Sequence, residues 1–279
     1  MMNPFRGWMT TTLAVVLALA GLSALAEDGK LVLDGSTTVG PIAKAFAEYY
    51  MGLHKEVNIT VSESGSGNGA KSLVNGSCDI ADMSRAMKDN EFAAATTNGI
   101  QPCAHVVALD GLAIALHPSN PVSGLSLDQI RSIYLGKITN WKDVGGVDKP
   151  IVVVTRDTNS GTFETFEGLV MDKQKIVQSA EVVGSNGAAR TRVASTPGAI
   201  GYVGLGFVDR TVKAIDVEGV YPEPETVQSG AYPIARPLYM YTNGYPKLGS
   251  LVHAFVTLHL SRKGQDIIES IGFVPTTQY

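Results

Sequence analysis

The stretch TRDTNSGTFE, residues 155–164, separates two segments with different apolar patterns. Residues 151–154 before it form a short apolar run rich in β-branched side chains, which favours a buried strand. After it, Phe163, Phe166 and Val170 recur at intervals of three to four residues, which is typical of one face of a helix. The sequence therefore predicts a strand, a polar turn and the start of a helix.

This polar turn has the hydrogen-bond donors that an oxyanion requires. The first N–H groups of a helix have no partner within the helix, and the helix dipole gives this end a partial positive charge. Gly161 lets an anion approach the backbone closely, Ser160 and Thr162 supply hydroxyl groups, and Arg156 supplies a guanidinium. The turn therefore predicts a site for a tetrahedral oxyanion. The alternative is a helix N-cap followed by an ordinary loop.

The same arrangement occurs twice nearer the N-terminus. GSTT, residues 35–38, follows a short apolar segment and precedes a helix that we expect to begin at about Pro41. SESGSGNG, residues 62–69, follows the alternating segment 57–61, and its glycines allow backbone N–H groups to surround an anion. Its similarity to a nucleotide-binding P-loop fails at Ala70, which stands in place of the second glycine. The recurrence strengthens the prediction of an anion site.

Strands and helices alternate along most of the chain, which predicts an α/β fold with parallel strands. Two segments interrupt this alternation: an apolar pair at residues 105–116, which could be one continuous strand passing between two lobes, and a returning strand at 236–241. Two such crossings predict two lobes with a cleft between them. Two helices, at about 248–260 and 264–271, are expected to close the chain. We expect one lobe to comprise residues 27–110 together with 237–279, and the other to comprise residues 111–236.

The N-terminal segment is typical of a secretory signal peptide. Residues 1–26 contain one charge, Arg6, followed by an apolar run that ends in Ala24-Leu25-Ala26. We expect cleavage after Ala26 and a periplasmic mature protein. A membrane anchor is the alternative, but the apolar run is short for a bilayer span.

Charge and composition exclude some classes of partner. The chain has a formal net charge of −4, with 44% apolar and 17% charged residues, and no basic block. This argues against a nucleic-acid partner. An acidic protein must hold an anion through local dipoles and individual side chains rather than through its net charge.

The residues typical of catalysis and metal binding are sparse. The five histidines show no H-E-x-x-H spacing, and the chain has no G-x-S-x-G nucleophile motif. We therefore expect no enzymatic activity, no metal and no cofactor. Cys78 and Cys103 could form a disulfide in an exported protein, or both could be buried thiols.

Six motifs occur in a fixed order along nearly all of the mature chain. They are DGSTTVGP (34–41), SGSGNGAK (64–71), Asp79-Ile80 with Ser84-Arg85, GKITNW (136–141), RDTNSGTF (156–163) and TPGAIGYV (196–203). Together they resemble the motifs of the periplasmic phosphate-binding protein of the high-affinity phosphate ABC transporter, in its shorter form. Each motif alone is weak, but the set in this order is specific.

This resemblance implies a fold and a function. The fold is the two-lobed periplasmic binding protein fold (type II), in which each lobe is a mixed, mostly parallel sheet flanked by helices and the ligand cleft lies between the lobes. The function is capture of inorganic phosphate by a monomer that delivers it to the membrane permease subunits of an ABC transporter. Carried over by motif, the ligands of the phosphate are Thr37, Thr38, Ser66, Arg156, Ser160, Gly161 and Thr162.

The sequence departs from the best-known form of the family at one position. That form has an Asp near the end of the segment after Ile80, which accepts the proton of hydrogen phosphate and so disfavours sulfate. Here the position holds Arg85, preceded by Ser84. Shorter members of the family also tend to have Ser-Arg, which implies either a contact between Arg85 and phosphate or a salt bridge of Arg85.

With no Asp at that position, another carboxylate must select a protonated anion. The candidates near the predicted turns are Glu63, Asp82 and Asp157, although Asp82 could be a simple turn residue and Asp157 could position Arg156. Two functions stay open beside phosphate transport. One is a receptor for another tetrahedral oxyanion such as sulfate, and the other is an adhesion or signalling module on the same fold.

Overall fold

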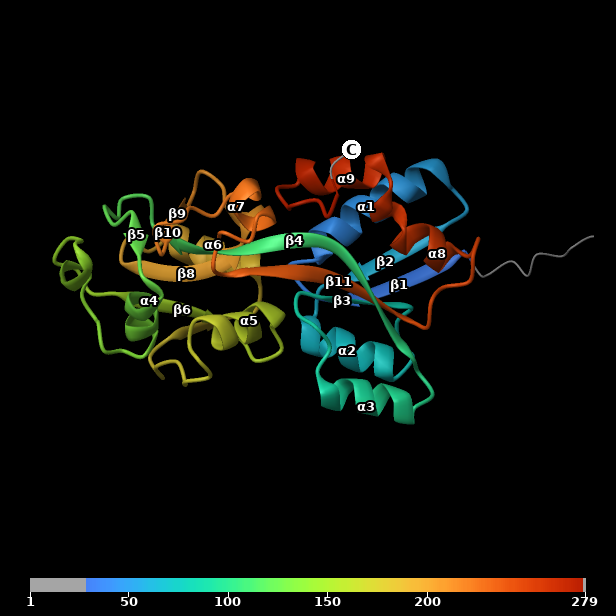
Figure 1. The fold of residues 1–279 in the computed structure, drawn as a ribbon, viewed down its shortest axis with the longest axis horizontal. Coiled ribbons are helices and arrows are strands. Elements are labelled where there is room, and N and C mark those ends of the chain that lie inside the picture. Colours follow the sequence, from blue (N-terminus) through green and yellow to red (C-terminus); the bar gives the residue numbers. More distant parts are fainter. Residues whose placement is uncertain (1–28, 278–279) are drawn as a thin grey trace, which may run out of the picture.

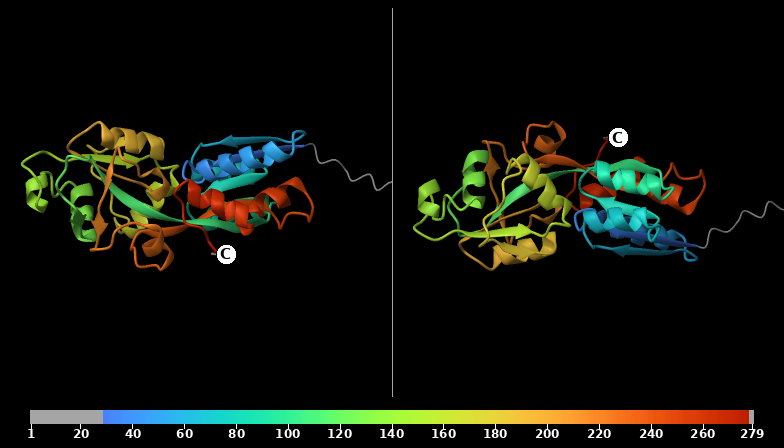
Figure 2. Two further views of the ribbon diagram at one scale, coloured as in Figure 1. Left: turned by 90° about the horizontal axis from the view of Figure 1, so that it is seen from above. Right: turned by 90° about the horizontal axis from the view of Figure 1, so that it is seen from below.

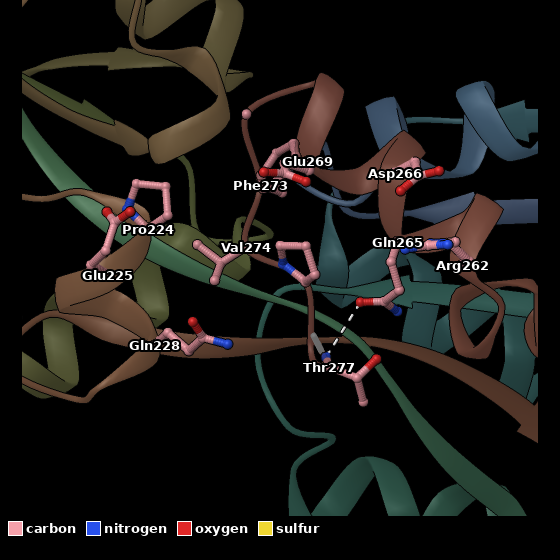
Figure 3. Close-up of a pocket in the computed structure, with 12 residues that line it drawn as sticks. Pro224, Glu225, Gln228, Arg262, Gln265, Asp266, Glu269, Phe273, Val274 and Thr277 are labelled. Atoms are coloured by element: carbon pink, nitrogen blue, oxygen red, sulfur yellow. Dashed lines mark hydrogen bonds between the residues drawn. The ribbon is translucent and has the colours of Figure 1, made fainter. Parts of the chain in front are cut away.

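The computed structural model describes residues 29–277. The predicted signal peptide, residues 1–26, lies outside the described residues. Two bodies of α/β structure lie side by side and are joined by long strands (Figures 1 and 2). Within the described residues, no helix combines the length and the apolar character needed to cross a membrane.

The first lobe contains the N-terminal elements and the C-terminal helices. Its elements are β1 (Lys30–Gly35), α1 (Gly40–Leu53), β2 (Asn58–Ser62), α2 (Ser66–Val74), β3 (Ile80–Met83), α3 (Asp89–Thr97), α8 (Leu251–Val256), η3 (Leu258–Leu260) and α9 (Arg262–Ser270). Helices α1, α8 and α9 cover one face of the sheet, and α2 and α3 cover the other (Figure 1). Leu33, Phe46 and Phe255 are fully buried in its core.

The second lobe contains the middle of the chain. Its elements are β5 (Gly124–Leu125), α4 (Leu127–Tyr134), η1 (Trp141–Val144), β6 (Val152–Arg156), α5 (Gly161–Leu169), β7 (Glu181–Val183), α6 (Asn186–Ala194), β8 (Ala199–Gly204), η2 (Leu205–Phe207), β9 (Lys213–Ala214), β10 (Asp216–Val217) and α7 (Pro224–Gln228). Its core is aromatic, because Phe166 stacks on Tyr202 at 4.0 Å between ring centroids. Trp141 is fully buried there and donates to the carbonyl of Gly198.

Two long antiparallel strands connect the lobes. They are β4 (Pro102–Leu116) and β11 (Ala235–Asn243), which lie next to one another in a nine-stranded sheet of order β2-β1-β3-β11-β4-β8-β6-β7, with β9 also paired to β4. Strand β4 pairs with β11 up to Gly111 and with β8 from Leu112 onward. The lobe limits 27–110 with 237–279, and 111–236, stay a prediction, which this change of partner supports.

The parallel strands explain where a site can form. In the first lobe β1 runs parallel to β2 and β3, and in the second lobe β6 runs parallel to β7 and β8. Ligands in such sheets bind beyond the carboxyl ends of the strands, where the following helices begin. The turns after β1 and β6 come from different lobes and meet in the structure, as the contacts described below show.

Of three predicted elements, one agrees with the structure and two differ from it in their limits. The apolar pair at residues 105–116 is one continuous strand, as the sequence suggested. Helix α2 begins at Ser66, so the Gly-rich segment forms the first helical turn instead of a loop before it. The predicted helix at about 248–260 is divided into α8 and η3, because His259 and its neighbours continue in a 3-10 turn.

Candidate functional site

The first turn of α5 carries the central part of the candidate site. Ser160 is the N-cap, and its hydroxyl accepts a hydrogen bond from the amide of Phe163 at 3.2 Å. Gly161 is the first helical residue and faces the other lobe. A Cβ at this position would lie 2.5 Å from Oγ of Ser66 and 2.7 Å from Oγ of Ser84. Only glycine therefore permits the two lobes to approach one another here.

The two lobes are in contact at this turn, so the structure is a closed form. The amide of Gly67 donates to the carbonyl of Asn159 at 3.0 Å. The hydroxyl oxygens of Thr38 and Thr162 lie 3.1 Å apart, and each residue is at most 1% exposed. Hydroxyl groups from the turns after β1 and β6 thus meet in the interior of the molecule.

Arg156, at the end of β6, has a free donor in this interior. Its side chain donates through Nε to the carbonyl of Val183 at 3.1 Å, and through Nη2 to Gly184 at 3.0 Å and to the hydroxyl of Thr37 at 3.3 Å. Nη1 is buried and has no hydrogen-bond partner among the described residues. An unsatisfied buried charged donor is costly unless a ligand completes it.

The charge of Arg156 persists at neutral pH. Burial lowers the pKa of Arg156 to about 10, and the carboxylate of Asp157 opposes that change. Among the described residues, no carboxylate forms a salt bridge with Arg156. The guanidinium therefore presents an uncompensated positive charge to the space between the lobes, which favours binding of an anion.

A second arginine, which the sequence analysis did not identify, completes the site. Arg236 is 6% exposed and lies directly opposite Asp110 across β11 and β4. Its Nη2 donates to Thr38 at 3.3 Å, to Thr162 at 3.1 Å and to Asp110 at 2.8 Å. The signal in the sequence was a lone Asp within an apolar strand, because a buried carboxylate requires a partner.

Asn186, at the start of α6, was also missed. Its amide nitrogen donates to the hydroxyls of Thr37 at 3.1 Å and Thr38 at 2.9 Å, and its oxygen accepts from the amide of Gly204 at 3.1 Å. These bonds link the two lobes and fix the orientation of both threonine hydroxyls. A single Asn after an N-cap Ser gives no sequence signal for this role.

Ser66 lies at the first turn of α2 and connects the site to β3. Its hydroxyl accepts from the amide of Ser84 at 3.0 Å, and the two hydroxyl oxygens are 3.3 Å apart. Both residues are at most 1% exposed. The structure therefore places Thr37, Thr38, Ser66, Arg156, Gly161 and Thr162 in one buried polar cluster, and Ser160 caps the helix that carries two of them.

Arg85 differs from the other predicted site residues. Its Nη1 and Nη2 donate to the carboxylate of Glu91 at 2.8 and 2.7 Å, and its Nε lies 2.8 Å from Oε2 of Glu164. Burial alone would lower the pKa of Arg85, but the hydrogen bonds that Arg85 donates to Glu91 and the charge of Glu164 raise it. Of the two roles that the resemblance implied, the structure contains the salt bridge.

The three carboxylates suggested as proton acceptors do not bond to the cluster. Asp82 lies within β3, so its interpretation as a turn residue is wrong; it is fully buried, and both of its carboxylate oxygens lack a partner among the described residues. Burial, followed by the charges of Asp34 and Glu63, raises the pKa of Asp82 well above its ordinary range. Glu63 pairs with Lys44, and Asp157 accepts the amide of Asn159.

Other expectations concern the cysteines and metals. Both cysteines are free thiols in the structure, and Cys78 is buried, so they do not form a disulfide with one another. Within residues 29–277, no group of three His, Cys, Asp or Glu side chains is arranged to hold a metal ion.

Comparison with known proteins gives consistent results. The model of the PBP superfamily domain matches residues 23–263. The phosphate-binding protein PstS of Bacillus subtilis is 33% identical over 257 residues, covering 89% of this chain and 81% of the relative. A substrate-binding protein from Clostridium perfringens, assigned to a phosphate ABC transporter and solved with bound phosphate, has a TM-score of 0.82 at 33% identity, covering 89% of this chain and all of the other.

A further solved structure supports the same fold. An ABC-type phosphate transport receptor from Vibrio cholerae has a TM-score of 0.71 at 34% identity, and the alignment covers 88% of this chain and 99% of the receptor. These similarities confirm the two-lobed binding-protein fold that the motifs implied.

Proposed function

The chain belongs to the PBP superfamily and to its phosphate-binding proteins of ABC transporters, and we propose that it closes its two lobes around one hydrogen phosphate ion in the periplasm. The unpartnered Nη1 of Arg156 is the observation that carries this proposal. A buried cation with a free donor, surrounded by hydroxyls from both lobes, is complementary to a small oxyanion. Phosphate supplies up to four acceptor oxygens to satisfy these donors.

The proposed ligands come from both sides of the cleft. Thr37, Thr38 and Ser66 contribute hydroxyl groups from the first lobe. Arg156, together with the α5 turn of Ser160, Gly161 and Thr162, contributes donors from the second lobe, with the positive end of the helix dipole toward the anion. Because one ion bonds to both lobes at once, binding stabilises the closed form relative to the open form.

Arg236 and Asp110 extend this set of ligands. Arg236 contacts Thr38 and Thr162, whose hydroxyl oxygens come from the two lobes and lie 3.1 Å apart. We propose that Asp110 accepts the proton of hydrogen phosphate. Its carboxylate uses one oxygen for the amide of Leu205 and the other for two bonds from Arg236, and a carboxylate accepts about four hydrogen bonds.

This assignment predicts selection of phosphate over sulfate. Sulfate has no proton at neutral pH, so one of its oxygens would face the Asp110 carboxylate without a bridging hydrogen. Leaving two buried acceptors in contact costs about 1–3 kcal/mol or more. Burial raises the pKa of Asp110 while Arg236 and the Leu205 amide oppose that change, and the pairing with Arg236 favours the ionised acceptor.

Delivery to a permease follows from the family membership. Relatives with the same fold are named as phosphate transport receptors of the ABC type. We propose that this chain likewise acts as a monomer, after removal of its signal peptide, and releases phosphate to the permease subunits without a chemical step.

Titration calorimetry of residues 27–279 tests this function. Phosphate should bind tightly with a stoichiometry of one, and sulfate should bind at least tenfold more weakly at the same ionic strength. Equal binding of the two ions would support a general oxyanion receptor. Absence of binding to either ion would contradict the proposal and favour an adhesion or signalling role.

A further inference from the structure

A group of four charged residues joins the two lobes beside the anion site. Arg85, Lys88 and Glu91 come from the first lobe, and Glu164 comes from the first turns of α5 in the second lobe. We propose that these residues form a cross-lobe clasp, which holds the closed form and sets the rate at which phosphate leaves. This inference rests on the proposed function, because it concerns the lifetime of the closed complex.

The geometry of the clasp centres on one carboxylate oxygen. Oε2 of Glu164 lies 2.8 Å from Nε of Arg85 and 2.8 Å from Nζ of Lys88. The other side of Arg85 is held by both oxygens of Glu91 at 2.7 and 2.8 Å. Glu91 therefore fixes the guanidinium within the first lobe, and Glu164 is the partner that opening of the lobes removes.

The clasp is shielded from water on most of its atoms. The side chains of Arg85, Glu91 and Glu164 are 9%, 16% and 13% exposed, whereas Lys88 is 48% exposed. Charge pairs in such an environment are screened less than surface pairs. The Arg85 to Glu164 pair should therefore contribute more than the Lys88 to Glu164 pair, which is close to a surface salt bridge.

The clasp is connected in sequence to residues of the anion site. Arg85 directly follows Ser84, whose amide bonds to Ser66, and Glu164 lies two residues after Thr162. Helix α5 also contacts the first lobe through Thr165, whose hydroxyl donates to the carbonyl of Ser84 at 3.5 Å. Closure around the anion and formation of the clasp thus involve the same two turns. The clasp adds cohesion between the lobes without contacting the ligand.

Balance of charge favours an electrostatic role over a purely structural one. In the closed form two cations meet two carboxylates, so the group is neutral. On opening, the first lobe keeps two cations with one carboxylate, and Glu164 alone carries its charge into water. Separating Glu164 from the two cations costs electrostatic free energy, which hydration of these charges in the open form offsets. Salt in the solvent reduces this electrostatic cost.

The test uses Glu164→Gln, with Glu167→Gln as the matched control. Both changes remove one negative charge from α5, but only Glu164 lies in the clasp. Phosphate dissociation, measured by stopped-flow displacement with a fluorescent phosphate trap, should accelerate about threefold to tenfold in Glu164→Gln. Association should change by less than twofold, and Glu167→Gln should match the wild type in both rates.

Two further measurements separate the clasp from a structural role. In a double-mutant cycle of Lys88→Met and Glu164→Gln, the two changes should not multiply in their effect on the dissociation rate. Lys88 pairs with the carboxylate oxygen of Glu164 that the second change alters. The loss of melting temperature in Glu164→Gln relative to wild type should be smaller without phosphate than with it. An unchanged dissociation rate, or equal destabilisation with and without phosphate, would overturn the clasp.

Failure of the proposed function would be recognised separately. If the wild type binds no phosphate, that proposal fails, and small-angle X-ray scattering at low salt then tests the clasp alone. Ligand-free Glu164→Gln should have a larger radius of gyration than the wild type, and the difference should vanish at high salt. Identical scattering of the two proteins at low salt would overturn the clasp in that case.

Discussion

Two arginines lie where the lobes meet, Arg156 buried and Arg85 partly buried, and they differ in whether the protein itself neutralises their charge. In the clasp, Arg85 donates two hydrogen bonds to Glu91 and has the Glu164 carboxylate at ion-pair distance, so two carboxylates neutralise its charge although its Nε makes no hydrogen bond. In the anion site, Arg156 bonds to two carbonyls and one hydroxyl and keeps one nitrogen without a partner. The first arginine is neutralised within the protein, whereas the second has charge and a donor available for a ligand.

This contrast shows that a buried arginine is available to an anion when no carboxylate of the protein pairs with it. Arg156 is the last residue of β6 and Arg85 lies two residues after β3, and each precedes a segment that leads to a helix. The carboxylates that neutralise Arg85 come from α3 and from α5 of the other lobe. The four predictions below test the contrast, and the clasp variants described above should have the smallest effect.

The largest effect should come from Arg156→Met, which removes the uncompensated charge. We expect phosphate binding to weaken about a thousandfold, or about 4 kcal/mol, because a buried donor to the anion is lost. The melting temperature without phosphate should stay the same or rise, since the buried charge is removed. Calorimetry and thermal unfolding measure both quantities. Arg85→Met is the matched control, and comparable weakening in that variant would contradict the contrast.

Asp110→Asn leaves Arg236 buried without a counter-ion. Breaking a buried ion pair from one side costs about 3 kcal/mol or more, so the unfolding free energy without ligand should fall by about that amount. Chemical denaturation measures this change. The variant should also lose its preference for phosphate over sulfate, because Asn can donate to an oxygen of either ion. Preserved selectivity in a folded variant would remove Asp110 from the role of proton acceptor.

Gly161→Ala tests whether the closed form is needed for binding. The added methyl group would lie 2.5 Å from Oγ of Ser66 in the other lobe, so full closure requires a shift of the backbone. We expect phosphate affinity to fall by about 2 kcal/mol, roughly thirtyfold, through faster dissociation. Gly168→Ala on the same helix meets no atom within 4 Å and serves as the control. Equal affinities of the two variants would contradict the closed geometry.

Asp82→Asn shows what an unpartnered charge costs when no ligand compensates it. The raised pKa of Asp82 means that the folded state binds its proton more tightly than the unfolded state. Below pH ~4 Asp82 is protonated in both the folded and the unfolded state, and its contribution to the free energy of unfolding is complete. As the pH rises toward the raised pKa of the folded state, the unfolded state loses this proton first and the free energy of unfolding falls. Asp82→Asn should therefore be about 1–2 kcal/mol more stable than wild type at neutral pH.

Thermal unfolding between pH 4 and pH 8 measures the effect of Asp82. The difference in melting temperature between Asp82→Asn and wild type should grow with pH, to about 3–6 °C at neutral pH. Phosphate should be absent from these scans, since binding would add its own pH dependence. A constant difference, or a wild type that is more stable at pH 8, would show that Asp82 finds a partner.

The sequence predicted those features that depend on local pattern. The strand, turn and helix at residues 151–170 depend on apolar spacing and on turn chemistry, which single segments contain. The continuous strand at 105–116 was also suggested by the sequence, because only Asp110 and Gly111 separate its two apolar segments. Helix α2 began earlier than expected because the glycines after Ser66 adopt helical conformations despite their low propensity.

The parts that could not be predicted depend on contacts between distant segments. Arg236 and Asp110 are far apart in the chain and become partners only through the pairing of β11 with β4. Likewise, Glu164 belongs to the same motif as the anion-binding turn, yet its side chain points to the other lobe and pairs with Arg85. The sequence of residues 156–164 alone does not show which of its side chains would contact an anion and which would join the clasp.

A crystal structure of the complex with arsenate, a phosphate analogue with an anomalous X-ray signal, tests the contrast between the two arginines most directly. We expect one strong anomalous peak within hydrogen-bonding reach of Nη1 of Arg156 and the hydroxyls of Thr38 and Thr162. Arg85 should still pair with Glu91 and Glu164. A peak beside Arg85, with its carboxylate partners displaced, would contradict the account.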